Sequence, residues 1–262
     1  MALSWRGTLG VLADLFFPPL CVLCEAPLGG ERPEVCFACR DSFRTLRPGG
    51  CARCGSPAPA SRLPCRLCRG WLELQGARSA YLFTGAVRGW IHAVKYGALT
   101  GLVPLAGAPL ERCLGDAVST WGAPAALVPV PLHAARRRER GFNQAELLAG
   151  ELAGRCGVPV VPVLARARPT RAQVELDAGK RRANVAGAFR VRPELEAFCR
   201  GRTLALVDDV LTTGSTLEAC AAALHDGGAE RVFAVTLARA VPTGAAPPVE
   251  ASGAKAYHCT LF

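Results

Sequence analysis

One stretch of the chain, residues 204–216, restricts the fold more than any other. It reads Leu-Ala-Leu-Val-Asp-Asp-Val-Leu-Thr-Thr-Gly-Ser-Thr, and a helical pattern begins at Leu217. The apolar residues predict a buried strand that delivers Asp208 and Asp209 to the carboxyl edge of a sheet. The small hydroxyl residues that follow predict a loop that opens into a helix. A strand, a short loop and a helix in this order favour a parallel sheet covered by helices.

The same stretch offers two kinds of contact to a ligand. Carboxylates of Asp208 and Asp209 can accept hydrogen bonds from vicinal ribose hydroxyls, and the loop Thr212–Thr216 can hold a 5-phosphate at a helix N-terminus. The chain has neither a GxxxxGK[ST] nor a GxGxxG motif, which argues against a P-loop or a dinucleotide fold. The alternative is an acidic turn and a capped helix without a ligand. Two adjacent carboxylates repel each other, so we expect a ligand or Mg²⁺ to share them.

Charge and apolar content set the class of protein and of partner. The chain has 262 residues, half of them apolar, and a formal charge of +10, which favours anionic partners such as pyrophosphate, nucleotides or nucleic acid. The segment Leu3–Phe17 is apolar, but Arg6 and Asp14 interrupt it. We therefore predict a short amphipathic helix there rather than a signal peptide, and a cytoplasmic protein without a membrane span.

Eight of the thirteen cysteines form four CxxC pairs near the N-terminus. They are Cys21/Cys24, Cys36/Cys39, Cys51/Cys54 and Cys65/Cys68. Two CxxC turns supply the four thiolates of a tetrahedral Zn²⁺ site, so eight thiols suit up to two structural sites. The spacing favours sequential pairing of the turns, although an interleaved arrangement, disulfides and an iron–sulfur cluster are the alternatives. Apolar residues are sparse here, so the metal would supply the folding energy.

After Trp71 the pattern alternates between strands and helices. Predicted strands cover residues 78–84, 126–130, 158–164, 203–207 and 231–237, and predicted helices cover 87–96, 99–114, 143–156 and 216–227. This alternation indicates a parallel α/β sheet with helices on both faces, and its ligand should lie beyond the carboxyl ends of the strands.

Two further segments have the composition of anion-binding loops. The first follows a predicted strand and contains Val130, Pro131, Leu132, His133, Arg136 and Arg140. The second, residues 166–184, is basic and aperiodic, and could close as a lid over a phosphorylated ligand; it includes Arg171, Arg181, Arg182 and Asn184. For both segments the alternative is an ordinary solvated basic loop.

The acidic pair and the Thr-Thr-Gly-Ser-Thr loop resemble the phosphoribosyl-pyrophosphate (PRPP) signature of type I phosphoribosyltransferases. This resemblance implies that Asp208 and Asp209 bind the ribose 2- and 3-hydroxyls. It also implies a 5-phosphate loop made of Leu211, Thr212, Thr213, Gly214, Ser215 and Thr216. Over residues 8–240 the chain resembles the ComF family. The further segments that carry this resemblance are the CxxC pairs, residues 92–96, the run Val-Pro-Val-Pro-Leu-His at 128–133, and residues 140–144, 170–173 and 182–184.

The family resemblance implies a zinc ribbon joined to a phosphoribosyltransferase domain and an association with DNA uptake in natural transformation. We accordingly predict a double zinc ribbon with an N-terminal helix at 1–75, a phosphoribosyltransferase domain at 76–242 and a flexible tail at 243–262. The predicted activity is Mg²⁺-dependent transfer of phosphoribosyl from PRPP to an unnamed acceptor. The alternatives are a protein that senses PRPP or a nucleotide and binds single-stranded DNA, and a scaffold whose ribbon recruits an uptake helicase.

Overall fold

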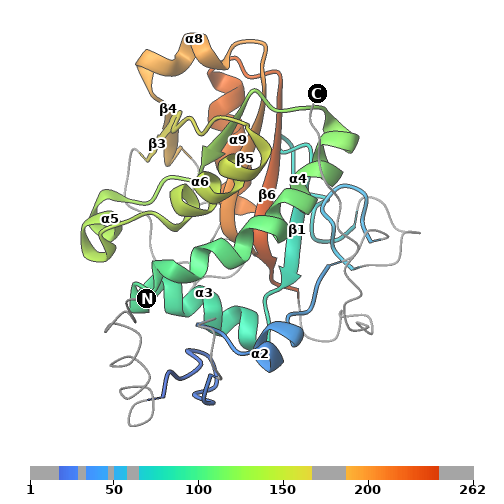
Figure 1. The fold of residues 1–262 in the computed structure, drawn as a ribbon. Coiled ribbons are helices and arrows are strands. Elements are labelled where there is room, and N and C mark those ends of the chain that lie inside the picture. Colours follow the sequence, from blue (N-terminus) through green and yellow to red (C-terminus); the bar gives the residue numbers. More distant parts are fainter. Residues whose placement is uncertain (1–17, 29–33, 47–49, 58–64, 167–186, 242–262) are drawn as a thin grey trace, which may run out of the picture.

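The structure, a computed structural model, describes residues 18–28, 34–46, 50–57, 65–166 and 187–241 (Figure 1). Its main sheet has the strand order β1–β6–β5–β2, and every neighbouring pair is parallel. The strands are β1 (Ala77–Leu82), β2 (Ala126–Pro129), β5 (Thr203–Leu211) and β6 (Arg231–Arg239). The predicted parallel sheet flanked by helices is therefore confirmed.

Helices cover both faces of this sheet (Figure 1). One face carries α3 (Gly85–Gly97), the 3₁₀ helix η1 (Thr100–Ala106), α4 (Gly107–Trp121) and α6 (Gln144–Cys156). The other carries α9 (Ser215–Asp226) and a separate antiparallel pair, β3 (Leu164–Arg166) with β4 (Phe189–Val191). Shorter elements are α2 (Phe37–Asp41), α5 (Ala134–Arg140), η3 (Pro193–Leu195) and α8 (Glu196–Cys199). Among the helices that the structure describes, none has the length and apolar character to cross a membrane.

The alternation along β5 divides the apolar core into two halves. Leu204 and Leu206 face α9, whereas Ala205 and Val207 face α4 and α6, and all four side chains are fully buried. A strand buried on both faces reads as a continuous apolar run, which is why residues 204–207 contain no polar side chain.

One predicted strand, residues 158–164, is wrong. Val160 makes only an isolated bridge to Leu127, and the chain then leaves the sheet to form β3. The reason is Pro159 and Pro162, which have no N–H to donate and therefore prevent a continuous ladder. The predicted helix over 99–114 is also divided, into η1 and α4.

The two cysteine-rich segments pack into the apolar cores on opposite faces of the sheet. Cys51, Cys54, Cys65 and Cys68 belong to the core under α9, and Cys21 belongs to the core under α3. Residues 44–46 lie beside β1 through hydrogen bonds from Leu46 N to Ala80 O (2.9 Å) and from Leu82 N to Arg44 O (2.8 Å). The ribbons thus share the core of the sheet, which explains why their own apolar residues are sparse. The predicted helix at 3–17 and the tail at 243–262 lie outside the described residues.

Candidate active site and metal centres

The acidic pair lies within β5, because the strand continues beyond the predicted end at residue 207 as far as Leu211. Successive strand residues point to opposite faces, so the two carboxylates have different surroundings. Asp209 points to the α3 face, where its Oδ2 lies 2.7 Å from Lys95 Nζ. Asp208 points to the α9 face, and its Oδ1 accepts a hydrogen bond of 2.8 Å from Asp209 N. The two acids are therefore chemically distinct.

The charges around the pair shift two pKa values in the same direction for different reasons. Burial and the neighbouring Asp209 charge raise the pKa of Asp208 to about 7, against the opposing effects of Lys95, the Asp209 N–H and Arg166. Burial lowers the pKa of Lys95, but the Asp209 and Asp208 carboxylates outweigh it and raise that pKa above its usual value. Lys95 thus stays a cation, and Asp208 is poised to change its charge near neutral pH.

The predicted 5-phosphate loop connects β5 to α9. Gly214 is the N-cap of α9 with φ at 83°, a left-handed conformation that favours glycine. Thr213 Oγ1 lies 2.8 Å from Ser215 Oγ and accepts a hydrogen bond of 3.4 Å from Ser215 N. Hydroxyls and the positive end of a twelve-residue helix therefore meet at the carboxyl end of β5, as an anion site requires.

The predicted pyrophosphate loop, Val130–His133, follows β2, the neighbour of β5 in the sheet. Asn143 holds its start, because Asn143 Nδ2 donates to Val130 O at 3.0 Å while Oδ1 accepts from Ala145 N at 3.1 Å. His133 caps α5 through a hydrogen bond of 3.3 Å from Ala135 N to Nδ1. This loop and the acidic pair lie on neighbouring strands of the sheet.

The arginines after this loop lie on α5, where a basic turn was expected. Arg136 is exposed, and Arg140 is partly buried with its guanidinium 5.0 Å from the ring centroid of Tyr96. Tyr96 itself is 64% exposed. The remaining lid residues predicted to bind pyrophosphate, Arg171, Arg181, Arg182 and Asn184, lie outside the described residues.

Lys95 had no assigned role in the sequence prediction, although the chain contains a signal for it. The buried side chains of α3 are Val87, Trp90, Ile91 and Val94, so Lys95 borders an apolar face that meets the sheet. A cation at the end of such a face requires a buried partner, and the acidic pair is the available one. Asn143 was missed for another reason, since its two hydrogen bonds depend on how β2 and α6 pack.

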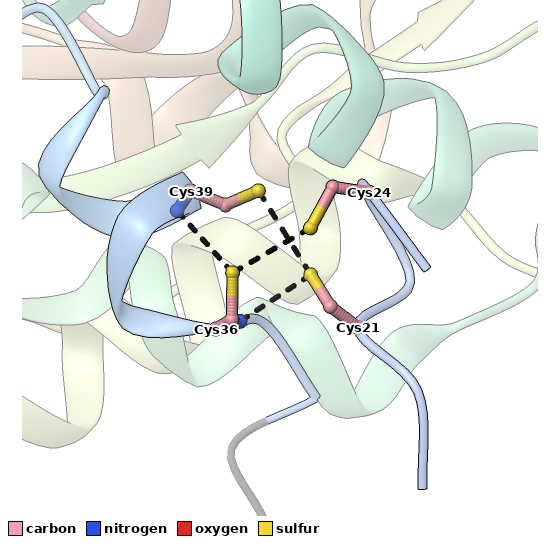
Figure 2. A group of neighbouring side chains, drawn as sticks. All are labelled: Cys21, Cys24, Cys36 and Cys39. Carbon is pink, nitrogen blue, oxygen red and sulfur yellow. Dashed lines mark hydrogen bonds between the residues drawn. The ribbon is translucent and has the colours of Figure 1, made fainter. Parts of the chain in front are cut away.

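The eight CxxC cysteines gather into two groups of four. Cys21, Cys24, Cys36 and Cys39 form the first cluster and Cys51, Cys54, Cys65 and Cys68 the second. Figure 2 shows the first cluster, with sulfur atoms pointing toward one centre. Five sulfur pairs are 3.4 to 3.9 Å apart, and all sulfur atoms of a cluster lie within 4.8 Å of one another. The five distances are close to the edge of about 3.8 Å that follows from tetrahedral Zn–S bonds of ~2.3 Å. Sequential pairing of the CxxC turns is therefore confirmed.

Burial, N–H groups and neighbouring sulfur atoms shift the pKa values of the thiols in each cluster in opposite directions. Burial raises the pKa of Cys21 and Cys51, but N–H groups directed at their sulfur atoms lower it to about 6. Burial and the neighbouring sulfurs raise the pKa of Cys39 and Cys54 well above the usual value. Four sulfur atoms can therefore carry negative charge together only when a cation lies among them.

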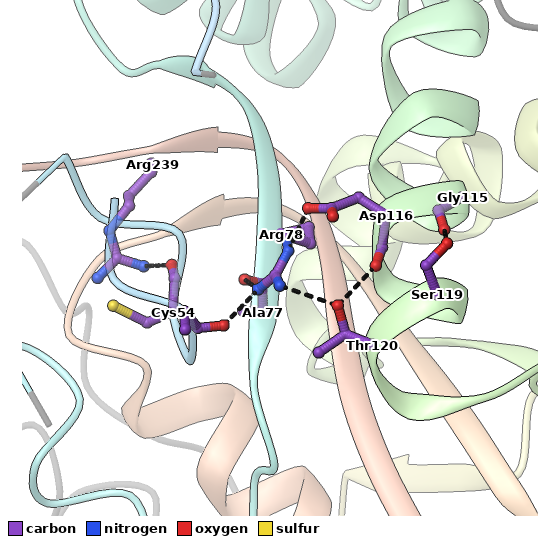
Figure 3. A network of polar contacts seen from close by, with 9 residues as sticks. Cys54, Ala77, Arg78, Gly115, Asp116, Ser119, Thr120 and Arg239 are labelled. Atoms are coloured by element: carbon purple, nitrogen blue, oxygen red, sulfur yellow. Dashed lines mark hydrogen bonds and ion pairs between the residues drawn. The ribbon is translucent and has the colours of Figure 1, made fainter. Parts of the chain in front are cut away.

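Arg239, at the end of β6, supports this interpretation for the second cluster. Its side chain is fully buried, and Nη1 donates to Cys54 O at 2.9 Å (Figure 3). Within the described part of the chain, Nε and Nη2 have no hydrogen-bond partner. A buried cation without a counter-charge is strongly unfavourable, and a tetrathiolate zinc centre carries the negative charge that Arg239 lacks. The residues thus fit structural Zn²⁺ in a closed site.

Comparisons with known proteins found two family matches in the chain. Residues 12–69 match the double zinc ribbon domain family, and residues 142–252 match the phosphoribosyl transferase domain family. The DNA utilization protein YhgH of Salmonella typhimurium is 34% identical over 232 residues, which cover 86% of this chain and 99% of that protein. Competence protein ComFC of Bacillus subtilis is 26% identical over 244 residues, which cover 84% of this chain and 95% of that protein. The chain belongs to the ComF family.

A third relative is competence protein F of Haemophilus influenzae. It is 40% identical over 118 residues, which cover 45% of this chain and 51% of that protein. The ComF assignment confirms the predicted combination of a double zinc ribbon with a phosphoribosyltransferase domain. The phosphoribosyl transferase match begins at residue 142, so Lys95 and the β2 loop lie before it. Their relation to the acidic pair comes from the geometry of the sheet alone.

Proposed function

We propose that this protein binds PRPP with Mg²⁺ and transfers the phosphoribosyl group to an acceptor with release of pyrophosphate. The observation that carries the proposal is the juxtaposition at one sheet edge of an acidic pair, a hydroxyl-lined helix N-terminus and the loop after β2. These groups match the hydroxyls, the 5-phosphate and the pyrophosphate of one ligand. Phosphoribosyl transfer therefore accounts for all three features together.

In this mechanism the acceptor attacks C1 of the ribose while the bond from C1 to the pyrophosphate oxygen breaks. Asp208 and Asp209 accept hydrogen bonds from the ribose hydroxyls and oppose the positive charge that develops on the ring. Lys95 holds the carboxylate of Asp209 in place, because its Nζ lies 2.7 Å from Asp209 Oδ2. The Val130–His133 loop donates to the departing pyrophosphate. Bound Mg²⁺ would neutralise part of the pyrophosphate charge, which is the chemistry that this ion supplies.

Calorimetry with PRPP and Mg²⁺ tests the binding step. We expect saturable binding by the wild type and none by Asp208→Asn, with zinc content equal in both proteins. A screen for pyrophosphate release with candidate bases and nucleic acids then tests transfer. A folded wild type that does not bind PRPP would refute the proposal, whereas binding without release would favour a sensor.

A second candidate function is binding of single-stranded DNA, and α5 is the observation that favours it. Arg136, Arg137 and Arg138 are exposed along this helix, and the exposed Tyr96 ring lies under Arg140. Basic side chains beside an exposed aromatic ring form the kind of surface that tracks a backbone and stacks a base. The names of the YhgH and ComF relatives, which refer to DNA utilization and competence, are consistent with this candidate.

The test of this second function is fluorescence anisotropy with a labelled single strand at several salt concentrations. Replacing Arg136, Arg137 and Arg138 by glutamine should weaken binding and flatten the salt dependence, by about 0.7 in slope per lost phosphate contact. The matched control replaces Arg190, Arg192 and Arg200, which are exposed elsewhere. Equal losses in both triple variants would show a nonspecific charge effect and contradict a site on α5.

Recruitment of a DNA-uptake helicase by the ribbon is a further prediction for this protein. The first ribbon exposes the apolar side chains of Leu20 and Phe37, which are 50% and 76% accessible. A Phe37→Asp variant should lose helicase capture while retaining both metal equivalents. Undiminished capture would exclude this surface as the contact.

A further inference from the structure

The second cysteine cluster and the predicted phosphate loop are in direct contact. Trp71 comes three residues after Cys68, and its backbone N donates to Cys68 O at 3.0 Å. Its indole Nε1 donates to Thr213 O, within the loop, at 3.2 Å. The Trp71 side chain is only 4% exposed, and a Cβ at Gly214 would lie 2.5 Å from Nε1. The indole therefore packs tightly against the loop that should bind the 5-phosphate.

Glu218, in the first turn of α9, forms a second connection. Its Oε1 accepts hydrogen bonds from Leu72 N and Glu73 N, the latter at 2.7 Å, and its Oε2 accepts from Leu74 N at 3.1 Å. One carboxylate thus holds three successive backbone N–H groups of the segment that leaves the cluster. Hydrogen bonds of N–H groups to an ionised carboxylate are roughly twice as strong as neutral ones.

Further contacts hold the carbonyl groups of the same segment. His225 Nε2, near the end of α9, lies 3.0 Å from Glu73 O, and Arg53 Nη2 donates to Leu74 O at 2.7 Å. Trp71 and the loop hydroxyls of Thr213 and Ser215 line one groove of about 410 Å³. The ribbon segment therefore forms a wall of the space beside the loop.

We propose that Trp71 and Glu218 are positioning residues for the phosphate loop, so that metal bound at the second cluster sets the affinity of this loop for a phosphate monoester. The inference rests on the proposed function for the identity of the ligand. The first cluster lacks such contacts among the described residues, because it packs against α3 and β1 on the other face. The two metal sites of one ribbon domain therefore have different consequences for ligand binding.

Cys68→Ser and Cys39→Ser provide a matched pair of variants, since each removes the last ligand of one cluster. We expect each to lose one zinc equivalent. Only Cys68→Ser should increase amide hydrogen exchange at residues 212–214 in the protein without ligand. Equal exchange in the two variants would overturn the inference, and this readout does not depend on whether PRPP is the ligand.

Trp71→Phe and Glu218→Gln test the contact without removing a metal ligand. Trp71→Phe retains an aromatic ring but loses the hydrogen bond to Thr213 O, which should weaken binding of ribose 5-phosphate and PRPP about three- to tenfold. Binding of inorganic pyrophosphate should be unchanged, because the loop after β2 holds that group. Equal weakening for ribose 5-phosphate and pyrophosphate would indicate general destabilisation and contradict a positioning role.

Different results would refute the proposed function and the coupling between the second cluster and the phosphate loop. A wild type that binds no PRPP refutes the function, while the exchange experiment still decides the coupling. A wild type that binds PRPP with the same affinity as metal-depleted Cys68→Ser refutes the coupling and leaves the function intact.

Discussion

Lys95 is the one lysine among the described residues, and its ammonium lies against a carboxylate of the predicted ligand site. Its side chain is 21% exposed and that of Asp209 is 13% exposed, so water screens the pair only weakly. Burying two charges is costly, and this cost is offset only while both remain. The pair therefore ties the geometry of the site to the stability of the fold.

Lys95→Met should destabilise the protein by about 3 kcal/mol, because the substitution leaves the Asp209 carboxylate buried without a counter-charge. Urea unfolding measures this change. The double variant Lys95→Met with Asp209→Asn should recover most of the loss, since neither charge remains. Strictly additive effects in this double-mutant cycle would show that the two residues do not interact.

Asp208 makes a separate contribution that depends on pH. Its pKa is raised from 3.8 to about 7 in the folded protein, mainly by burial and then by Asp209. The folded protein therefore retains a proton that the unfolded chain releases, so stability falls as pH rises from about 4 to 7. Asp208→Asn should remove this slope and stabilise the ligand-free protein above pH 7, by on the order of 2 kcal/mol.

Urea unfolding of wild type and Asp208→Asn at pH 5, 6, 7 and 8 checks this expectation. The difference between the two proteins isolates Asp208 from the cysteines and other groups that titrate in the same range. A difference that stays constant across these pH values would contradict a raised pKa for this carboxyl.

At the scale of elements, the N-cap residue of α6 holds the loop after β2. Asn143 both caps α6 and donates to Val130 O. Asn143→Asp keeps the cap, because Oδ1 remains an acceptor, but removes the donor to Val130. We expect it to cost about 1 kcal/mol or more in stability and to weaken binding of pyrophosphate more than that of ribose 5-phosphate.

Asn143→Ala, which loses the cap as well, serves as the comparison for this prediction. It should destabilise the protein further by about 1 kcal/mol, the usual value of an N-cap. Calorimetry with the two ligands and thermal unfolding measure both quantities. Equal weakening for ribose 5-phosphate and pyrophosphate would show that Asn143 does not act through the β2 loop.

The sequence predicted those elements whose signal is local. An apolar run, an acidic pair and hydroxyl residues sufficed for β5 and α9, and the spacing of CxxC turns sufficed for both clusters. The strand predicted over 158–164 was wrong because Val and Leu favour strands while Pro159 and Pro162 withhold ladder donors. The contacts of Asn143 and Trp71 join different elements, so no local pattern indicates them. For Lys95 the apolar face of α3 indicates a buried cation, but the pattern does not indicate which acid it contacts.

At the scale of the whole molecule, the second ribbon cannot be separated from the sheet without exposing the phosphate loop. A deletion of residues 1–75 removes Trp71 and the backbone groups that Glu218 binds. It also removes the second cysteine cluster, which leaves the Arg239 guanidinium without a counter-charge. Such a deletion therefore tests the stability of the sheet rather than the role of the ribbon in partner binding.

The burial of the two clusters predicts an order of metal loss. In the first cluster Cys24 is exposed and Cys36 and Cys39 are partly exposed, whereas all four cysteines of the second are buried. Chelator should therefore remove about two equivalents of zinc in two phases, the faster from the first cluster. The fast phase should be absent from Cys39→Ser and the slow phase from Cys68→Ser.

Release of the second metal should lower the stability of the sheet, because it leaves the Arg239 guanidinium buried without a counter-charge. In Arg239→Met this dependence should be lost: zinc binds the second cluster less tightly, and the metal-free protein is more stable than the wild type without metal. Colourimetric chelation measures zinc release, and thermal unfolding followed by circular dichroism measures the stability after each phase. A single release phase, or slow release without a fall in the unfolding midpoint, would mean that the second cluster does not stabilise the core.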